Sequence, residues 1–430
     1  MINSLYIAQS GLTTSRYSVD VTSNNIANEN TQGYIKRVVN TSETTDSQDD
    51  IGNGVSFDSV TRSSSDYLYD KLVSQSSLSS YYNQEDSTLS EIEIMFNETE
   101  SGGLSTTLSN FFDSIESLRS NPTNSIYKNE VSTQAEMLVD NLQSLNSGLD
   151  DTFNSTIEQF EDQVDSVNNI LKQIVYLNEQ MIQNNTASND LLDKRDLLEK
   201  ELSNYVDIKV DRNSDTYNLK IAGVNVISNN TNFNEITING DFSDLNNLDT
   251  SLMVYNTKLY LSSGSLKSLT QNLTTETSSI SSYKQSLNEF ATALVDYTTN
   301  NSTVALFSGT DVESLTFEEN NLSSLTSDDL KNLAQMQWDE NVTIGTTSDT
   351  SFSEFYQNLL VTISSDVENN NFKLDSQDAI VNSLETTYNN LTKVDPDQEM
   401  INLLQYQSAY EANAKVITVV DEMLQTLLAM

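Results

Sequence analysis

The sequence of 430 residues contains no cysteine and no histidine. Disulfide bonds, thiol nucleophiles, zinc or iron sites built from Cys or His, and catalytic triads with a His base are therefore excluded. Basic residues are scarce, with 21 Lys and Arg against 63 Asp and Glu, which gives a net charge of −42. Duplex nucleic acid is a poor partner for such a chain, because binding depends on neutralising phosphates with Lys and Arg.

Proline and glycine are also rare, with 2 and 12 residues respectively. Disordered chains are usually rich in these residues, so the low apolar content of 36 % does not by itself indicate disorder. Few helix breakers among many Asn, Ser and Thr residues predict long, uninterrupted helices. No apolar run reaches the ~18 residues of a membrane-spanning helix. The start of the chain lacks the basic and apolar parts of a secretory peptide, so we expect no such signal.

Both ends of the chain carry apolar residues at alternating steps of three and four, the spacing of a coiled-coil seam. One such stripe alone would fit a helix packed in the core of its own domain, whereas two matched stripes favour pairing. We predict that the two ends pair with each other and with further copies, and that both are mobile in the monomer and become helical on assembly. The predicted seam residues are Ile2, Leu5, Leu12, Val19 and Ile26, then Leu403, Tyr406, Tyr410, Asn413, Ile417, Val420, Leu424 and Leu427.

The last helix has a start signal in the sequence at Asp395-Pro396-Asp397-Gln398. Asp395 is predicted as the N-cap and Pro396 as the first helical residue, where its missing N–H costs nothing. Gln398 stands three residues after the cap, the position that closes a capping box. We therefore expect a helix that runs unbroken from this point to the C-terminus.

Two long motifs resemble those shared by bacterial flagellar rod, hook and hook-associated proteins. They are the stretch 23–34 (SNNIANENTQGY) and the stretch 406–417 (YQSAYEANAKVI). Within this axial family, residues 52–62 and the segment 191–202 (LLDKRDLLEKEL) resemble the hook-associated proteins of the hook–filament junction. In the first motif we expect Asn24, Asn25 and Asn28 to end a helix, Gly33 to supply a free turn and Tyr34 to anchor the chain again.

The resemblance implies a structural protein of the bacterial flagellum that joins hook to filament as a ring of subunits. It implies type III export through the flagellar channel, with further copies, the hook protein and the second junction protein as neighbours. A cytosolic export chaperone is expected to cover Ile417, Val420, Leu424 and Leu427, which form an apolar face. It implies no enzymatic activity, cofactor, metal site, nucleic-acid partner or membrane insertion. A hook or distal-rod subunit, and a secreted adhesin or surface enzyme on the same termini, remain alternatives.

The interior of the chain predicts a mainly α fold with a small inserted β domain. Amphipathic patterns predict helices over 68–98, 104–119, 126–149, 153–181, 266–297 and 352–391. Period-2 alternation between 203 and 264 predicts short strands. We expect a terminal coiled-coil domain (1–40 and 395–430), a discontinuous helical bundle (41–202, 265–300 and 350–394) and an outer β-rich domain (203–264 with part of 301–349).

The many carboxylates invite a calcium or acid–base site. The best candidates, Asp211, Asp215 and the pair Asp328-Asp329, do not fit the spacing of an EF-hand loop. With 63 acidic residues in the chain, a pair of neighbouring carboxylates carries little information. We therefore interpret these residues as solvated surface and predict no catalytic residue.

Overall fold

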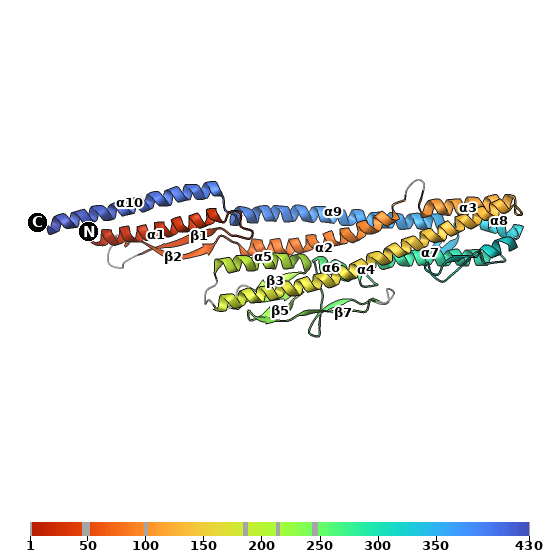
Figure 1. Cartoon of the computed structure of the whole chain (residues 1–430), viewed down its shortest axis with the longest axis horizontal. Helices are drawn as coiled ribbons and strands as arrows, with labels where there is room; N and C mark the ends of the chain where they lie inside the picture. The colour runs from red at the N-terminus through yellow and green to blue at the C-terminus, as the bar shows by residue number, and fades with distance from the viewer. Residues whose placement is uncertain are drawn as a thin grey trace.

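The computed structural model describes residues 2–44, 52–98, 102–183, 188–211, 216–242 and 248–429. The molecule is elongated, and both chain termini lie at the same end (Figure 1). Two long terminal helices form that end, a helical body forms the rest, and small antiparallel sheets lie along one side of the body. No helix of the described residues is long and apolar enough to cross a membrane.

The terminal unit consists of α1 (Ile2–Ala27), α10 (Pro396–Leu428) and a hairpin of β1 (Arg37–Glu43) and β2 (Val55–Arg62). The two helices contact each other along their length, and the hairpin covers another side of α1. Tyr17 stacks on Phe57 with ring centroids 4.3 Å apart. The predicted pairing of the two ends is therefore present within one chain, with both helices formed.

The start of α10 agrees with the sequence in its cap but not in its capping box. The Asp395 carboxylate accepts hydrogen bonds from the backbone N–H groups of Asp397 (3.0 Å) and Gln398 (3.2 Å), and Pro396 is the first helical residue. The Gln398 side chain instead donates to Asn402, one turn further on. The sequence could not distinguish these two partners, because both lie within reach of a Gln at this position.

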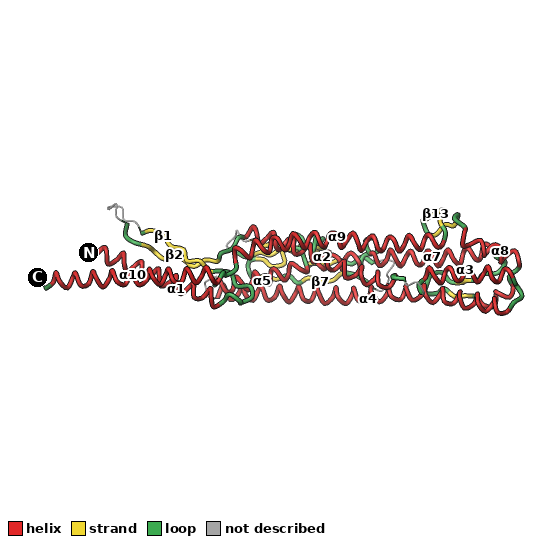
Figure 2. The backbone as a smooth tube through the Cα atoms, turned by 90° about the horizontal axis from the view of Figure 1, so that it is seen from above, coloured by secondary structure: helices red, strands yellow, loops and turns green. Residues whose placement is uncertain are grey.

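The body is built from α2 (Asp66–Phe96), α3 (Leu104–Ser120), α4 (Ser125–Gln183), α5 (Asn189–Tyr205), α6 (Ser265–Asn272), α7 (Ser279–Asn301), α8 (Ser327–Gln335) and α9 (Phe352–Thr392). Helices α2 and α9 pack side by side, and α3 packs on α4 (Figure 2). The helix predicted over 352–391 is confirmed as α9. Two short 3-10 helices, η2 (Glu319–Ser324) and η3 (Met336–Trp338), complete the far end.

Two helix predictions need correction. The segments 126–149 and 153–181 form the single helix α4, because neither proline nor a glycine with positive φ interrupts them. The predicted helix over 266–297 is instead two helices, α6 and α7. Between them, Thr275 Oγ1 accepts the Leu248 N–H (2.8 Å), and Ser278 caps α7 by accepting the N–H of Ser281. These side-chain hydrogen bonds compete with a continuous helix.

The predicted strands between 203 and 264 form two antiparallel sheets. The first contains β3 (Ile208–Asp211), β4 (Asn218–Ile221), β5 (Val224–Ser228) and β6 (Asn232–Phe233), and the second contains β7 (Ile236–Asn239), β8 (Ser251–Val254) and β9 (Thr257–Leu259). Two further hairpins, β10 (Phe307–Ser308) with β11 (Thr316–Phe317) and β12 (Val342–Ile344) with β13 (Thr347–Thr350), pack on α7. They form sheets of their own.

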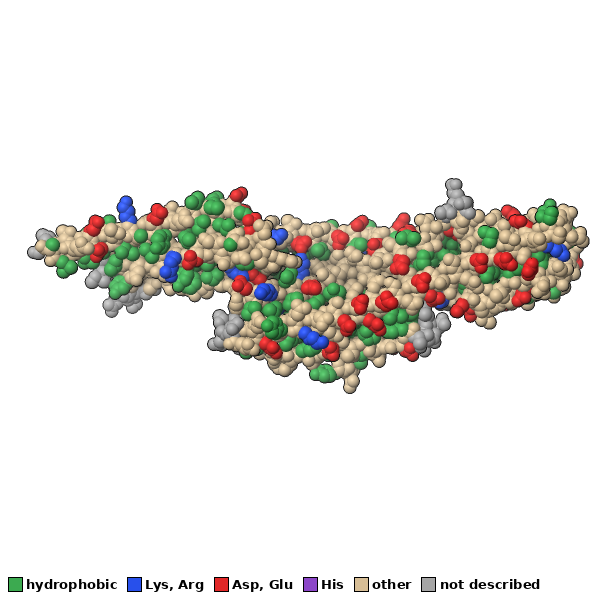
Figure 3. Space-filling view, in the orientation of Figure 1, with side chains coloured by type: hydrophobic (Ala, Val, Ile, Leu, Met, Phe, Trp, Pro, Cys, Tyr) green, Lys and Arg blue, Asp and Glu red, His purple; other side chains and the backbone are tan. Residues whose placement is uncertain are grey.

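One apolar core runs through the body and the β segments. Its members extend from Leu89 to Val367, with Phe160, Leu171 and Phe290 almost completely buried. Among the described residues, no member of this cluster comes from the terminal unit. Exposed apolar side chains gather over α1 and α10, whereas acidic side chains are spread along the body (Figure 3).

Candidate assembly face and the joint behind it

The predicted seam residues lie on partly covered sides of the two terminal helices. On α1, Leu5, Leu12, Val19 and Ile26 are half-buried, and the Ile2 side chain lies outside the described residues. In the last two turns of α10, the exposure of the predicted seam residues increases from 7 % at Val420 to 53 % at Leu427. Tyr410 is 38 % exposed. The remaining predicted seam residues on α10 are half-buried: Leu403, Tyr406, Asn413, Ile417 and Leu424.

The most buried face of α1 is offset from the predicted seam by one residue. Its members are small or polar: Ala8, Ser15, Ser18, Thr22 and Asn25. Of these, Ser18 and Asn25 each stand one position before a predicted seam residue, Val19 and Ile26 respectively. The reason is that α1 is covered from two sides, by α10 and by the β1–β2 hairpin, so the deepest face lies between them. Small residues permit the close approach: a Cβ added at Gly11 would lie 2.8 Å from Nδ2 of Asn413.

A second apolar face of α10 is left uncovered. Ile401 and Leu404 are 59 % and 58 % exposed, and three residues further along are about as exposed. Their spacing keeps these side chains on one side of the helix, away from α1. We call this set the outer face of α10: Ile401, Leu404, Val416, Val419 and Met423.

Behind the helix pair, the motif residue Asn25 connects three segments of the chain. Its side chain is 1 % exposed. Nδ2 donates to the Arg37 carbonyl (2.9 Å) and to the Glu399 carboxylate (3.0 Å). Oδ1 accepts from the Arg37 N–H (2.9 Å) and from the Tyr34 hydroxyl (2.8 Å). Asn25 therefore ties the end of α1 to the start of β1 and the first turn of α10.

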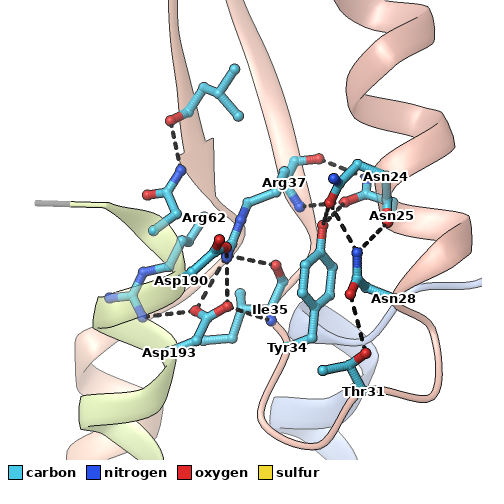
Figure 4. Close-up of polar contacts among 12 residues, drawn as sticks. Asn24, Asn25, Asn28, Thr31, Tyr34, Ile35, Arg37, Arg62, Asp190 and Asp193 are labelled. Carbon is cyan, nitrogen blue, oxygen red and sulfur yellow. Dashed lines mark hydrogen bonds and ion pairs between the residues drawn. The ribbon is translucent and has the colours of Figure 1, made fainter.

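The other motif residues build the turn that follows α1 (Figure 4). Asn28 donates to the Asn24 carbonyl (2.9 Å), and the Tyr34 hydroxyl also donates to Asn24 Oδ1 (3.1 Å). Gly33 has a φ of +77°, the left-handed region in which glycine carries no steric penalty. Burial, reinforced by nearby carboxylates and opposed by Arg37, raises the pKa of Tyr34 to about 12, so its hydroxyl stays a donor.

Two arginines of the hairpin meet a row of acids on α5. Arg37 binds the Asp193 carboxylate with both Nη atoms (3.2 and 2.6 Å), and its Nη2 also reaches Asp190 (3.1 Å). Arg62 bridges Asp193 (3.2 Å) and Asp196 (2.6 Å). The side chains of both arginines, Asp193 and Asp196 are at most 14 % exposed, whereas that of Asp190 is 78 % exposed. Figure 4 shows Arg37, Arg62, Asp190 and Asp193 between the hairpin and α5.

The segment 191–202 therefore supplies the two buried acids of this row, Asp193 and Asp196. We call the whole arrangement the joint: Asn25, Tyr34, Arg37, Arg62, Asp193, Asp196 and Glu399. Asn25 and Tyr34 were predicted from the motif 23–34, whereas the two arginines and Glu399 were not predicted. A signal was present, since acidic residues recur every third position at Asp190, Asp193, Asp196 and Glu199, and residues three apart are neighbours on a helix surface.

The acidic candidates of the sequence that lie in the described residues are Asp211, Asp328 and Asp329. Asp329 is the N3 residue of a capping box on α8 and accepts hydrogen bonds from Thr326 and Thr303. Asp211 ends β3, and Asp215 lies outside the described residues. Among the residues that the structure describes, no group of three or more acidic side chains is placed to hold a metal ion.

Comparison with known proteins identifies the family. The model for the helical domain of the flagellar hook-associated protein FlgK matches residues 89–306, just over half of the chain. The model for the C-terminal region of flagellar basal body rod FlgEFG proteins matches 387–430, and that for the flagella basal body rod protein matches 5–34. The last two contain α10 and most of α1, together with the Asn25 motif.

Individual relatives agree with this assignment. Flagellar hook-associated protein 1 of Bacillus subtilis is 24 % identical over 99 % of this chain and 97 % of its own length. The protein of the same name from Salmonella typhimurium is 30 % identical over 50 % of this chain, but the match covers only 40 % of the relative. The fold resembles that of the flagellar hook junction protein FlgK from Burkholderia pseudomallei, with a TM-score of 0.50 and 18 % identity over 56 % of this chain and 46 % of that one. The chain belongs to the FlgK family of flagellar hook-associated proteins.

Proposed function

We propose that this chain is the structural subunit that joins the flagellar hook to the filament, and that it acts as a ring of copies. Membership of the family makes it a structural component of the flagellum. The observation that carries the proposal is the outer face of α10, which pairing with α1 leaves uncovered. The proposed contact is mechanical and requires no catalytic residue.

The outer face of α10 supports contact with neighbouring copies. Its five apolar side chains are 44–59 % exposed, as a tube wall requires when each helix pair has neighbours on both sides. Full burial of one such side chain contributes ~1.5–3 kcal/mol, so covering the exposed half of five contributes on the order of 5 kcal/mol per subunit. A weak contact of this size, repeated around a ring, favours assembly without making the free subunit aggregate.

Further partners belong to the same proposal. We propose that the terminal helices continue the lattice of the hook below and meet the second hook-associated junction protein above. Before export through the flagellar channel, a cytosolic chaperone would cover Ile417, Val420, Leu424 and Leu427. Val420 is 7 % exposed in the folded pair, so this chaperone and α1 would exclude each other on α10.

Electron microscopy of a strain that lacks the gene tests the proposal. We expect hooks without filaments and flagellin monomers in the medium. Intact filaments with lost surface attachment would instead support an adhesin that carries its binding part at β3–β9. Filaments missing together with hooks would support a hook or distal-rod subunit.

A point substitution tests the role of the seam. Leu424→Asp places a charge on a partly covered apolar side of α10, so ring assembly and chaperone binding should both be lost. Thr418→Asp is the matched control, because it adds the same charge on an exposed polar side of the same helix. Motility on soft agar and pull-down of the chaperone measure the two effects. Normal motility of the Leu424→Asp strain would contradict the proposal.

A further inference from the structure

The terminal unit and the body are joined without a shared apolar core. The core cluster of the body extends from Leu89 to Val367 and, within the described residues, includes none from α1, β1, β2 or α10. Apolar contacts are not directional and tolerate sliding. An apolar boundary would therefore set the angle between the two parts poorly.

Apart from Ile35, which is 4 % exposed, the contacts described at this boundary are polar and ionic. The row on α5 receives Arg37 and Arg62 from neighbouring strands, and the Asp193 carboxylate alone accepts from both guanidinium groups and from the Ile35 N–H (3.3 Å). Bidentate arginine–carboxylate pairs impose a fixed relative orientation on the segments that carry them. Buried pairs of this kind contribute little net stability but can specify one arrangement.

Asn189 Nδ2 on α5 also donates to the Val60 carbonyl of β2 (3.1 Å). Two further contacts of the terminal unit lie at the end of α9. The Lys36 N–H donates to the Thr392 carbonyl (2.7 Å), and Ser63 Oγ donates to the Leu391 carbonyl (3.0 Å). The chain itself crosses the boundary at 63–65 and at 393–395. Anchors at the end of one helix permit rotation about that helix end, whereas a further anchor on α5 prevents it.

We propose that Asp193 and Asp196 are positioning residues that fix the direction in which α1 and α10 leave the body. They act through Arg37 and Arg62, and they do not contact the assembly face themselves. Because the joint belongs to a single chain, this inference does not depend on the ring proposed above, and it is tested on the isolated protein.

The absence of native cysteine makes a distance measurement direct. Spin labels at Gln405→Cys on α10 and Ser364→Cys on α9 occupy exposed positions on the two parts. Gln405 lies ten residues after Asp395, close to the joint, so fraying at the tips of the terminal helices affects it little. We expect a single narrow distance distribution for the otherwise unchanged chain, measured by pulsed electron paramagnetic resonance.

Asp193→Asn should broaden or shift this distribution, because Asn cannot bind two guanidinium groups in the same way. Asp190→Asn is the matched control: it removes a carboxylate from the same helix that also contacts Arg37 but is exposed. Arg62→Gln approaches the joint from the other partner, and urea unfolding shows whether each variant remains folded. If Asp193→Asn and Arg62→Gln both keep the narrow distance distribution, or if the distribution of the parent chain is already broad, the proposal is wrong.

Discussion

Replacement of Asn25 by alanine gives a direct test of the joint. The substitution removes four hydrogen bonds from a residue that is 1 % exposed. A neutral buried hydrogen bond contributes ~1 kcal/mol and one to a charged group ~1.5–3 kcal/mol. Tyr34 keeps its bond to Asn24, and Glu399 keeps its contact with Asn402, which reduces the loss. We therefore expect opening of the joint to become easier by about 3 kcal/mol, or roughly a hundredfold.

Amide hydrogen exchange at Arg37 measures this change. Its N–H donates to Asn25 Oδ1 in the parent chain, so its protection factor should fall about a hundredfold in Asn25→Ala. Asn24→Ala serves as the control, because Asn24 is exposed and bonds only within the turn. Unchanged protection at Arg37 in Asn25→Ala would refute the assignment of Asn25 as the tie between three segments.

Two carboxylates in the body, the half-buried Glu85 and the buried Asp329, give predictions with opposite signs. Burial raises the pKa of Glu85, so its charged form destabilises the folded protein at pH 7. Glu85→Gln keeps an acceptor for Ser268 and Asn272 and should raise the free energy of unfolding at pH 7 by about 0.5–2 kcal/mol. In urea titrations below about pH 4 this gain should vanish. Although burial alone would raise the pKa of Asp329, donors from Thr326 and Thr303 hold it at about 2. The Asp329 carboxylate therefore stabilises the folded protein above pH ~4, and this stabilisation is lost as the pH falls toward 2. Asp329→Asn should lower the free energy of unfolding by about 1–2 kcal/mol at pH 7 and by almost nothing at pH 2. Equal urea midpoints for the variant and the parent chain at pH 7 would contradict this.

Local signals in the sequence identified most helices and strands. The N-cap at Asp395 and the helix over 352–391 depend on residues within a few positions of one another, and so does the alternation of β3–β9. The split between α6 and α7 was missed because its cause, the bond from Leu248 to Thr275, comes from a distant segment. The offset face of α1 was missed because its buried members are small and polar, which hydropathy cannot recognise.

The joint shows the same limit at larger scale. Asn25 and Glu399 are separated by 374 positions, and Arg37 and Asp193 by 156, yet both pairs are in contact. The motif around Asn25 and the acidic row of α5 were each visible as local patterns. The contact between them depends on the tertiary packing of four segments, which the periodicity of the sequence does not predict.

The boundary between the terminal unit and the body also constrains how such a chain can change. Since no apolar side chain of the core cluster crosses it within the described residues, the body can gain or lose volume without repacking α1 and α10. The charged and amide groups of the joint would then be enough to connect bodies of different size to the same pair of terminal helices. Substitutions far out on the body should accordingly be tolerated more readily than a single exchange of Asp193.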